Sequence, residues 1–196
     1  MSVQNSQSTM TDTPVARPRA RRWLQSLFKG SLLLVLGAAS VLPHAASAGT
    51  LELGKPAPPL VLNTLNGQRI ATQDLQGDVV IVTFWATWCA PCRQELAILS
   101  EYAERHAQQG LRVLAFSLDG ADELPQVRDI ASKLSFPVGL LGSSWAGEYG
   151  RIWRVPVSFV IDRNGHLVDN GWTDPEPAWT AKRLARVVDP LFPHKD

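Results

Sequence analysis

Residues Val79 to Cys92 read VVIVTFWATWCAPC, and this stretch decides the fold of the chain. The run from Val79 to Trp85 is β-branched and aromatic throughout, which predicts a strand covered on both faces. Cys89 and Cys92 follow directly and are the only cysteines among 196 residues. The pattern then turns helical, so the two cysteines are expected at the junction between a buried strand and a helix.

The rest of the chain alternates strand patterns with helix patterns. A helix is predicted over Cys89 to Gln109, with Gly110 as its stop signal. Asn66-Gly67 predicts a hairpin turn between two short apolar segments. The other expected elements are strands over Leu111–Leu118 and Phe136–Leu141, a helix with a stripe from Leu124 to Leu134, a hairpin of Val157–Ile161 with His166–Asp169, and a helix over Pro177–Val188. This alternation predicts a three-layer α/β domain.

The first 48 residues have the order of a secretory signal. Five Lys or Arg residues precede an apolar run from Leu32 to Leu42, and Ala46-Ser47-Ala48 follows. The apolar run is about a dozen residues, shorter than the roughly 20 of a spanning helix, so we expect cleavage after Ala48, with an uncleaved membrane anchor as the alternative. Either way, 1–48 is a leader and 49–196 is one globular domain outside the cytoplasm.

The charge balance of the domain argues against a nucleic-acid partner. The chain has 19 Lys or Arg and 18 Asp or Glu residues. The leader holds five of the basic and one of the acidic residues, which leaves 14 and 17 in the domain. A net charge near −3 without a basic patch gives no electrostatic basis for binding nucleic acid.

The cysteine pair has three conceivable uses. A structural disulfide around only Ala90 and Pro91 would stabilise little, because the loop it closes is so short. A zinc site needs four ligands and the chain has no second C-x-x-C, although a dithiolate could still hold Cu(I). A redox pair fits the position best, since a sulfur at a helix N-terminus is stabilised as a thiolate.

In the redox interpretation each residue of the motif has a task. Cys89 is the attacking sulfur, and Cys92 in the first helical turn closes a disulfide and releases the substrate. Pro91 suits the first turn because its missing N–H costs nothing there. Trp88 is expected to shield the disulfide and offer a docking surface, whereas Trp85 on the buried strand is expected in the core.

The stretch FWATWCAPCRQE resembles the active site of thioredoxin-fold proteins of the extracytoplasmic TlpA/ResA family. The resemblance covers about Leu51 to Leu191 and includes GKPAP from Gly54, FSLD from Phe116 and PVSFVID from Pro156. It implies a thioredoxin fold with a central mixed sheet, an N-terminal β-hairpin and a central βα insertion. The domain 49–196 is thus expected to be thioredoxin-like.

The resemblance also assigns roles outside the C-x-x-C. It implies a cis peptide bond at Pro156, which bends the chain beside the cysteines and leaves the Val155 backbone free to pair with an extended substrate. It implies that Glu95, one turn after Cys92, exchanges a proton with that thiol; burial would raise its pKa as this requires. Trp153 and Arg154, just before this bend, are candidates for partner choice, with an ordinary solvated loop as the alternative.

The expected function is that of a periplasmic or outward-facing thiol-disulfide oxidoreductase. Its only redox group is the Cys89–Cys92 disulfide, with no other cofactor and no metal. We expect a reductase, since Ala90-Pro91 adds no charge inside the motif; a thiol oxidase and a Cu(I)-delivery module are the alternatives. A peroxidase is disfavoured, because Val82 and Ala86 stand where peroxiredoxins carry proline and threonine. The resemblance implies protein thiol clients, such as apocytochrome c or copper-site thiols, and a membrane thiol electron donor.

Overall fold

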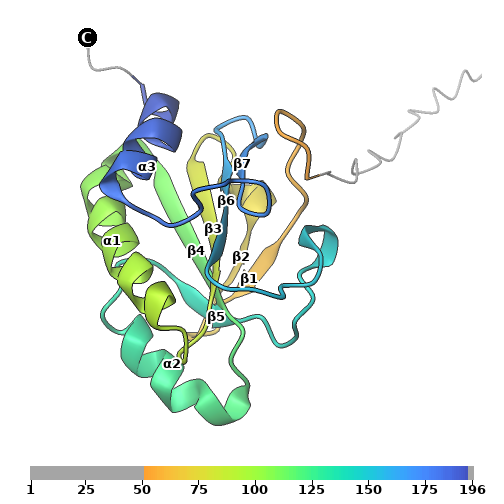
Figure 1. Cartoon of the computed structure of the whole chain (residues 1–196), viewed down its shortest axis with the longest axis vertical. Helices are drawn as coiled ribbons and strands as arrows, with labels where there is room; N and C mark the ends of the chain where they lie inside the picture. The colour runs from red at the N-terminus through yellow and green to blue at the C-terminus, as the bar shows by residue number, and fades with distance from the viewer. Residues whose placement is uncertain (1–50, 194–196) are drawn as a thin grey trace, which may run out of the picture. The chain divides into compact units, whose positions relative to one another are not determined.

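A computed structural model describes residues 51–193 (Figure 1). The predicted leader over 1–48 lies outside the described residues, so its cleavage and any anchoring stay predictions. Within 51–193, no helix is both long and apolar enough to cross a membrane.

A five-stranded mixed sheet forms the centre of the domain. Its order is β5-β4-β3-β6-β7. The first three strands in this order run parallel, and β6 and β7 are antiparallel to their neighbours. The strands are β3 (Val79–Trp85), β4 (Leu111–Ser117), β5 (Val138–Leu140), β6 (Val157–Ile161) and β7 (Leu167–Asn170). Every residue of β3 is buried, as its uniformly apolar pattern predicts.

The three α-helices cover one face of this sheet, on the left in Figure 1. They are α1 (Ala90–His106), α2 (Leu124–Ala131) and α3 (Ala181–Val187). The predicted apolar stripes face inward, because Leu96 and Leu99 of α1, Val127 of α2 and Leu184 of α3 share one buried cluster. Helix α2 with β5 forms the expected βα insertion at the sheet edge next to β4.

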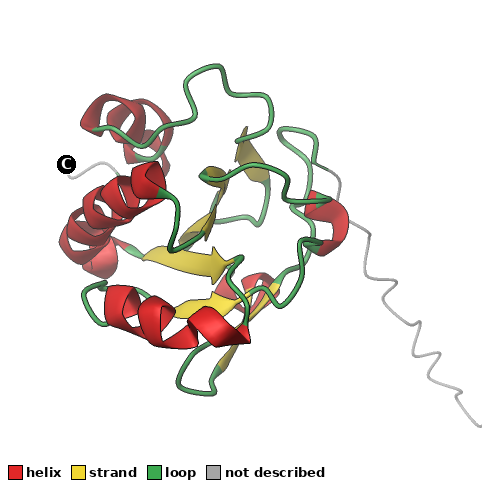
Figure 2. Cartoon of the chain, turned by 60° about the horizontal axis from the view of Figure 1, so that its bottom comes forward, coloured by secondary structure: helices red, strands yellow, loops and turns green. Residues whose placement is uncertain are grey.

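The opposite face is covered by an N-terminal hairpin and by irregular chain (Figure 2). The hairpin pairs β1 (Val61–Asn63) with β2 (Arg69–Ala71) as a separate two-stranded sheet. Aromatic rings fill the space beneath, with the ring centroids of Tyr149 and Phe159 4.8 Å apart. Short 3-10 turns complete the chain at Thr72–Leu75, Ala107–Gln109, Ala121–Glu123, Gly147–Tyr149 and Asp189–Leu191. The predicted thioredoxin fold is confirmed.

The last helix begins later than its sequence pattern predicts. The pattern indicates Pro177–Val188, but α3 starts at Ala181 because the Thr180 side chain caps it, accepting a hydrogen bond from the N–H of Arg183 at 3.1 Å. Arg183 also donates from Nη1 to the carbonyl of Pro177 at 2.8 Å, which holds the preceding segment in an irregular conformation. Trp179 therefore lies before the helix and points its ring into the core, where it is 1% exposed.

Candidate active site

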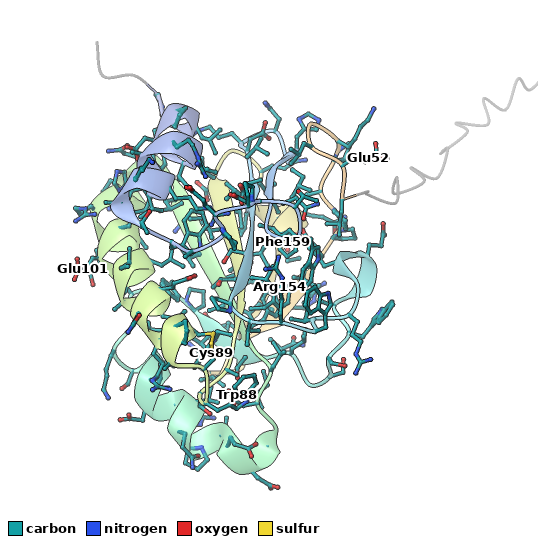
Figure 3. The ribbon with its side chains drawn as sticks, viewed as in Figure 1. Glu52, Trp88, Cys89, Glu101, Arg154 and Phe159 are labelled. Atoms are coloured by element: carbon teal, nitrogen blue, oxygen red, sulfur yellow. A yellow bond between two sulfur atoms is a disulfide. The ribbon has the colours of Figure 1, made fainter. Side chains whose placement is uncertain are left out.

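Cys89 and Cys92 lie at the N-terminus of α1, joined by a disulfide with their Cα atoms 5.3 Å apart (Figure 3). Cys89 is the N-cap residue in extended conformation, and its Sγ accepts a hydrogen bond from the N–H of Cys92 at 3.2 Å. Pro91 is in the first turn, as predicted. Cys89 is 6% exposed and Cys92 1%, so Cys89 is the sulfur that a partner reaches first.

The loop that enters the motif is fixed by Asp119, which follows β4. One carboxylate oxygen accepts from the N–H of Thr87 at 2.8 Å and from the hydroxyl of Ser117 at 2.6 Å. The other oxygen accepts from the hydroxyl of Thr87 at 2.7 Å. Strands β3 and β4 are parallel, so their carboxyl ends meet at one sheet edge, and this carboxylate joins the two loops there. Asp119 sets the position of the residues just before Cys89.

Glu95 lies one turn after Cys92 and is buried, with 7% of its surface exposed. Burial raises the pKa of Glu95 to about 7, against the opposing effects of the Trp179 backbone N–H and the positive charge of Arg183. Glu95 is therefore not a solvent-exposed residue of the helix surface. A carboxyl group with this pKa can both accept and return a proton near neutral pH.

A polar chain runs through the core behind the disulfide. The indole N–H of Trp179 donates to the hydroxyl of Ser158 at 3.0 Å, and that hydroxyl donates to the hydroxyl of Thr83 at 2.9 Å. Trp179 belongs to the same buried cluster as both cysteines. These two hydrogen bonds fix the Trp179 indole, and with it the Trp179 backbone N–H that faces Glu95.

A buried ion cluster supports the other side of Trp179. The guanidinium of Arg183 lies 3.9 Å from the centre of the Trp179 ring. It donates to a carboxylate oxygen of Asp169 at 2.5 Å and to one of Asp174 at 3.0 Å. The two carboxylates thus share one buried cation, and the half-exposed Arg186 adds a second positive charge 3.5 Å from Asp174. Asp119, Trp179 and Arg183 were not among the predicted site residues.

The bend at Pro156 is formed as expected. The Val155–Pro156 peptide bond is cis. Within residues 51–193, no backbone hydrogen bond reaches the N–H or C=O of Val155. The Val155 side chain packs against the cluster that holds Cys89 and Cys92 and also against the aromatic cluster on the other face of the sheet. Val155 therefore links the disulfide to that second face.

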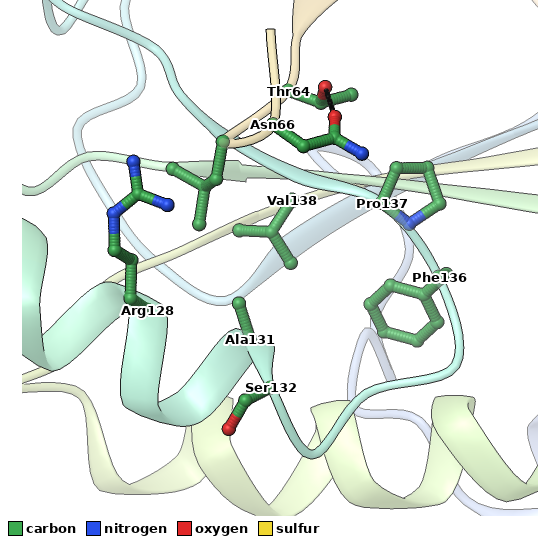
Figure 4. A pocket seen from close by; sticks show the side chains of 9 residues that line it. Thr64, Asn66, Arg128, Ala131, Ser132, Phe136, Pro137 and Val138 are labelled. Atoms are coloured by element: carbon green, nitrogen blue, oxygen red, sulfur yellow. Dashed lines mark hydrogen bonds between the residues drawn. The ribbon is translucent and has the colours of Figure 1, made fainter. Parts of the chain in front are cut away.

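The tryptophans of the motif separate as predicted. Trp85 is fully buried in the core, and Trp88 is 70% exposed beside Cys89. A hollow next to Trp88 reaches across to Pro125 and Ile130 on α2. A second hollow, between the hairpin and α2, is lined by residues such as Asn66, Arg128 and Phe136 and includes no cysteine or carboxylate (Figure 4). The first hollow is also not lined by a cysteine, but Thr87, Trp88 and Arg93 place it beside the C-x-x-C motif.

In the part of the chain from 51 to 193, no group of three or more His, Cys, Asp or Glu side chains could hold a metal ion. The pair itself is present as a disulfide. The roles predicted for Cys89, Cys92, Glu95 and Val155 fit this geometry and stay predictions.

The AhpC/TSA family model matches residues 53–170. The chain belongs to this family. It is 33% identical over 150 residues to the thiol-disulfide oxidoreductase ResA of Bacillus thuringiensis (strain Al Hakam), covering 73% of this chain and 85% of the relative. It is 28% identical to the thioredoxin-like protein YneN of Bacillus subtilis (strain 168), covering 76% and 88%.

Solved structures give the same result. A thiol:disulfide interchange protein DsbE from Chlorobium tepidum superposes with a TM-score of 0.54 at 29% identity, covering 62% of this chain and 86% of that one. The resemblance to ResA-like thiol-disulfide oxidoreductases that the sequence predicts is confirmed, and so is the enzyme class.

Proposed function

We propose that this chain is an extracytoplasmic protein-disulfide reductase that works through Cys89 and Cys92. The observation that carries the proposal is the placement of the pair. Cys89 caps the N-terminus of α1, where backbone N–H groups and the helix dipole favour a thiolate. Cys92 is more deeply buried in the first turn of α1, and the buried Glu95 follows it by one helical turn.

The forward cycle begins from the reduced dithiol. The Cys89 thiolate attacks one sulfur of a client disulfide, and the other client sulfur leaves as a thiolate and is protonated. Cys92, after losing its proton, attacks the Cys89 sulfur of the mixed disulfide and displaces the second client sulfur. Two electrons pass to the client, and the Cys89–Cys92 disulfide is the oxidised product.

Glu95 is the base that we propose for the second step. The Cys92 thiol is 1% exposed, so it has little access to solvent as a proton acceptor. The pKa of Glu95, about 7, lets the carboxylate take this proton and pass it on to the leaving client sulfur. Thr83, at the centre of the strand below, cannot serve because a hydroxyl does not titrate in this range.

The direction of electron flow rests on what the motif lacks. Ala90 and Pro91 add no charge and no side-chain donor that would strongly stabilise the reduced thiolate, as a strong oxidant requires. We propose that a membrane thiol donor re-reduces the domain, and that its clients are protein disulfides of the apocytochrome c or copper-site kind. An oxidising compartment makes such a reductant necessary.

The leader fits this placement. Its order of basic, apolar and small residues supports export, with cleavage after Ala48 or retention as an anchor. N-terminal sequencing of protein from the native host, with membrane and soluble fractions compared, distinguishes the two.

The test is a trapping experiment in the native host. Cys92→Ala removes the resolving thiol, so clients should accumulate as mixed disulfides on Cys89 that migrate as heavier species on a non-reducing gel. Cys89→Ala is the matched control and should trap none or far fewer. The absence of trapped species in both variants would contradict the proposal, and tight stoichiometric Cu(I) binding without disulfide reduction would favour a copper-delivery module.

A further inference from the structure

Trp153 is an exposed side chain that the fold nevertheless holds in place. It is 71% exposed. Its ring stacks on that of Trp172, with centroids 5.6 Å apart and planes 13° from parallel. Trp172 is itself fixed, since its indole N–H donates to the carbonyl of Tyr149 at 3.1 Å and its ring packs edge-on against buried Phe159. The exposed indole therefore rests on a rigid base.

Arg154 completes this platform. Its guanidinium carbon lies 5.3 Å from the centre of the Trp153 ring and 5.5 Å from that of Trp172. Its Nη2 donates to the carbonyl of Gly171 at 2.8 Å. Cation–π contacts of this kind add to the stacking and restrict both rings. We call Trp153, Arg154 and Trp172 the tryptophan platform.

An exposed ring that its neighbours fix in one position differs from an exposed ring without such contacts. Trp145, on the same irregular segment, is 63% exposed, and in residues 51–193 its ring has no stacking or cation–π contact. An ordered indole loses little conformational entropy when a partner docks on it, which is why rigid tryptophans dominate the energetics of interfaces. Trp153 has this property and Trp145 does not.

The tryptophan platform adjoins the backbone segment with which we expect a client to pair. Trp153 is two residues before Val155, whose backbone groups are unpaired in the described chain and whose side chain packs against the cysteine cluster. The chain bends at Arg154–Pro156, so Trp153 lies beside the unpaired Val155 backbone and not on a continuous strand with it. A client segment that pairs with Val155 therefore brings a side chain a few residues from its cysteine near Trp153.

We propose that the tryptophan platform is a specificity subsite that binds an aromatic side chain of the client segment flanking the attacked disulfide. The proposal rests on the disulfide exchange proposed above. An aromatic ring suits the site because the outer face of Trp153 is flat, apolar and open, and ring stacking adds to simple burial. The Arg154 guanidinium below makes a charged client side chain of the same sign unfavourable there.

The test uses two synthetic peptides, each closed by one disulfide, that differ only in carrying Phe or Ala at the residues flanking both cysteines. The full domain is reduced, freed of reductant and mixed with each peptide, and the second-order rate constant for peptide reduction is measured. The wild type should react with the Phe peptide about five to ten times faster than with the Ala peptide. In Trp153→Ala this ratio should fall to near one.

Trp145→Ala is the matched control, because it removes an equally exposed indole outside the platform, and it should keep the wild-type ratio. A ratio that Trp153→Ala leaves unchanged, a wild-type ratio of one, or an equal loss in Trp145→Ala would each overturn the subsite and leave the proposed function standing. A wild-type protein that reduces neither peptide nor glutathione disulfide would overturn the proposed function and the subsite together.

Discussion

Glu95→Gln should make the oxidised domain more stable at neutral and alkaline pH. The carboxyl group has an ordinary pKa of 4.5, and burial raises it to about 7 in the folded domain. Between these values the unfolded chain has already released the proton that the folded domain still holds. Stability therefore falls as the pH rises through this window and stays low above it. Glutamine has nearly the same shape and no charge, so Glu95→Gln removes this loss of folding stability at high pH.

The size of the effect follows from the shift in pKa. A difference of about 2.5 pKa units corresponds to roughly 3 kcal/mol, and screening by solvent near the carboxyl group reduces the expected value to about 2 kcal/mol. The variant should exceed the wild type by this amount at pH 8. At pH 4 the carboxyl group is mostly protonated in both states, so the two proteins should be nearly equal.

Urea unfolding of the oxidised proteins at a series of pH values between 4 and 8 measures this difference. Glu101→Gln is the control, since Glu101 is exposed on the same helix, and it should leave the profile unchanged (Figure 3). A Glu95→Gln variant that parallels the wild type at every pH would refute a buried, proton-holding Glu95 and remove its proposed role as the base for Cys92.

Two further predictions concern the supports of the site. Asp119→Asn replaces an acceptor of three hydrogen bonds with a group that must present a donor to one of them, so the domain should lose about 1–3 kcal/mol in urea unfolding and the Thr87 amide should exchange hydrogen faster; an unchanged exchange rate would contradict the role of Asp119 in fixing the loop. Arg183→Met leaves the buried Asp169 without its cation, whereas Asp174 keeps Arg186 at 3.5 Å. The variant should lose about 3–5 kcal/mol at pH 7, with a smaller loss near pH 4, because burial raises the pKa of Asp169 and this carboxylate protonates there; a loss that does not depend on pH would show that packing, and not charge, dominates there.

The sequence predicts the elements whose signal is local. The apolar run of β3 and the period of α1 each lie within one continuous stretch, so burial and amphipathicity are readable from their order. Glu95 is singled out by the family resemblance, and its spacing of three from Cys92 agrees, because this spacing places it beside the buried side of the helix. Its depth of burial is not local, and the two groups that oppose the rise in its pKa, the Trp179 backbone and Arg183, come from a segment far along the chain.

The missed residues act across long separations. Asp119 contacts Thr87, 32 residues earlier, and only the parallel pairing of β3 and β4 brings them together. An aspartate directly after a buried strand was the available signal. Arg183 in an amphipathic pattern reads as a solvent-facing residue, and its burial depends on two carboxylates from other segments. The same contacts shorten α3, which the periodic pattern alone extends to Pro177.

The central claim is that Cys89 and Cys92 are a working pair poised for reduction of clients. Equilibration of the domain with glutathione redox buffers, read by alkylation of the free thiols, gives its reduction potential. We predict a value between about −300 and −200 mV, the range of reducing thioredoxin-fold proteins. A value near −120 mV would contradict the reductase assignment, and a value far below about −300 mV would indicate a structural disulfide instead of a redox pair.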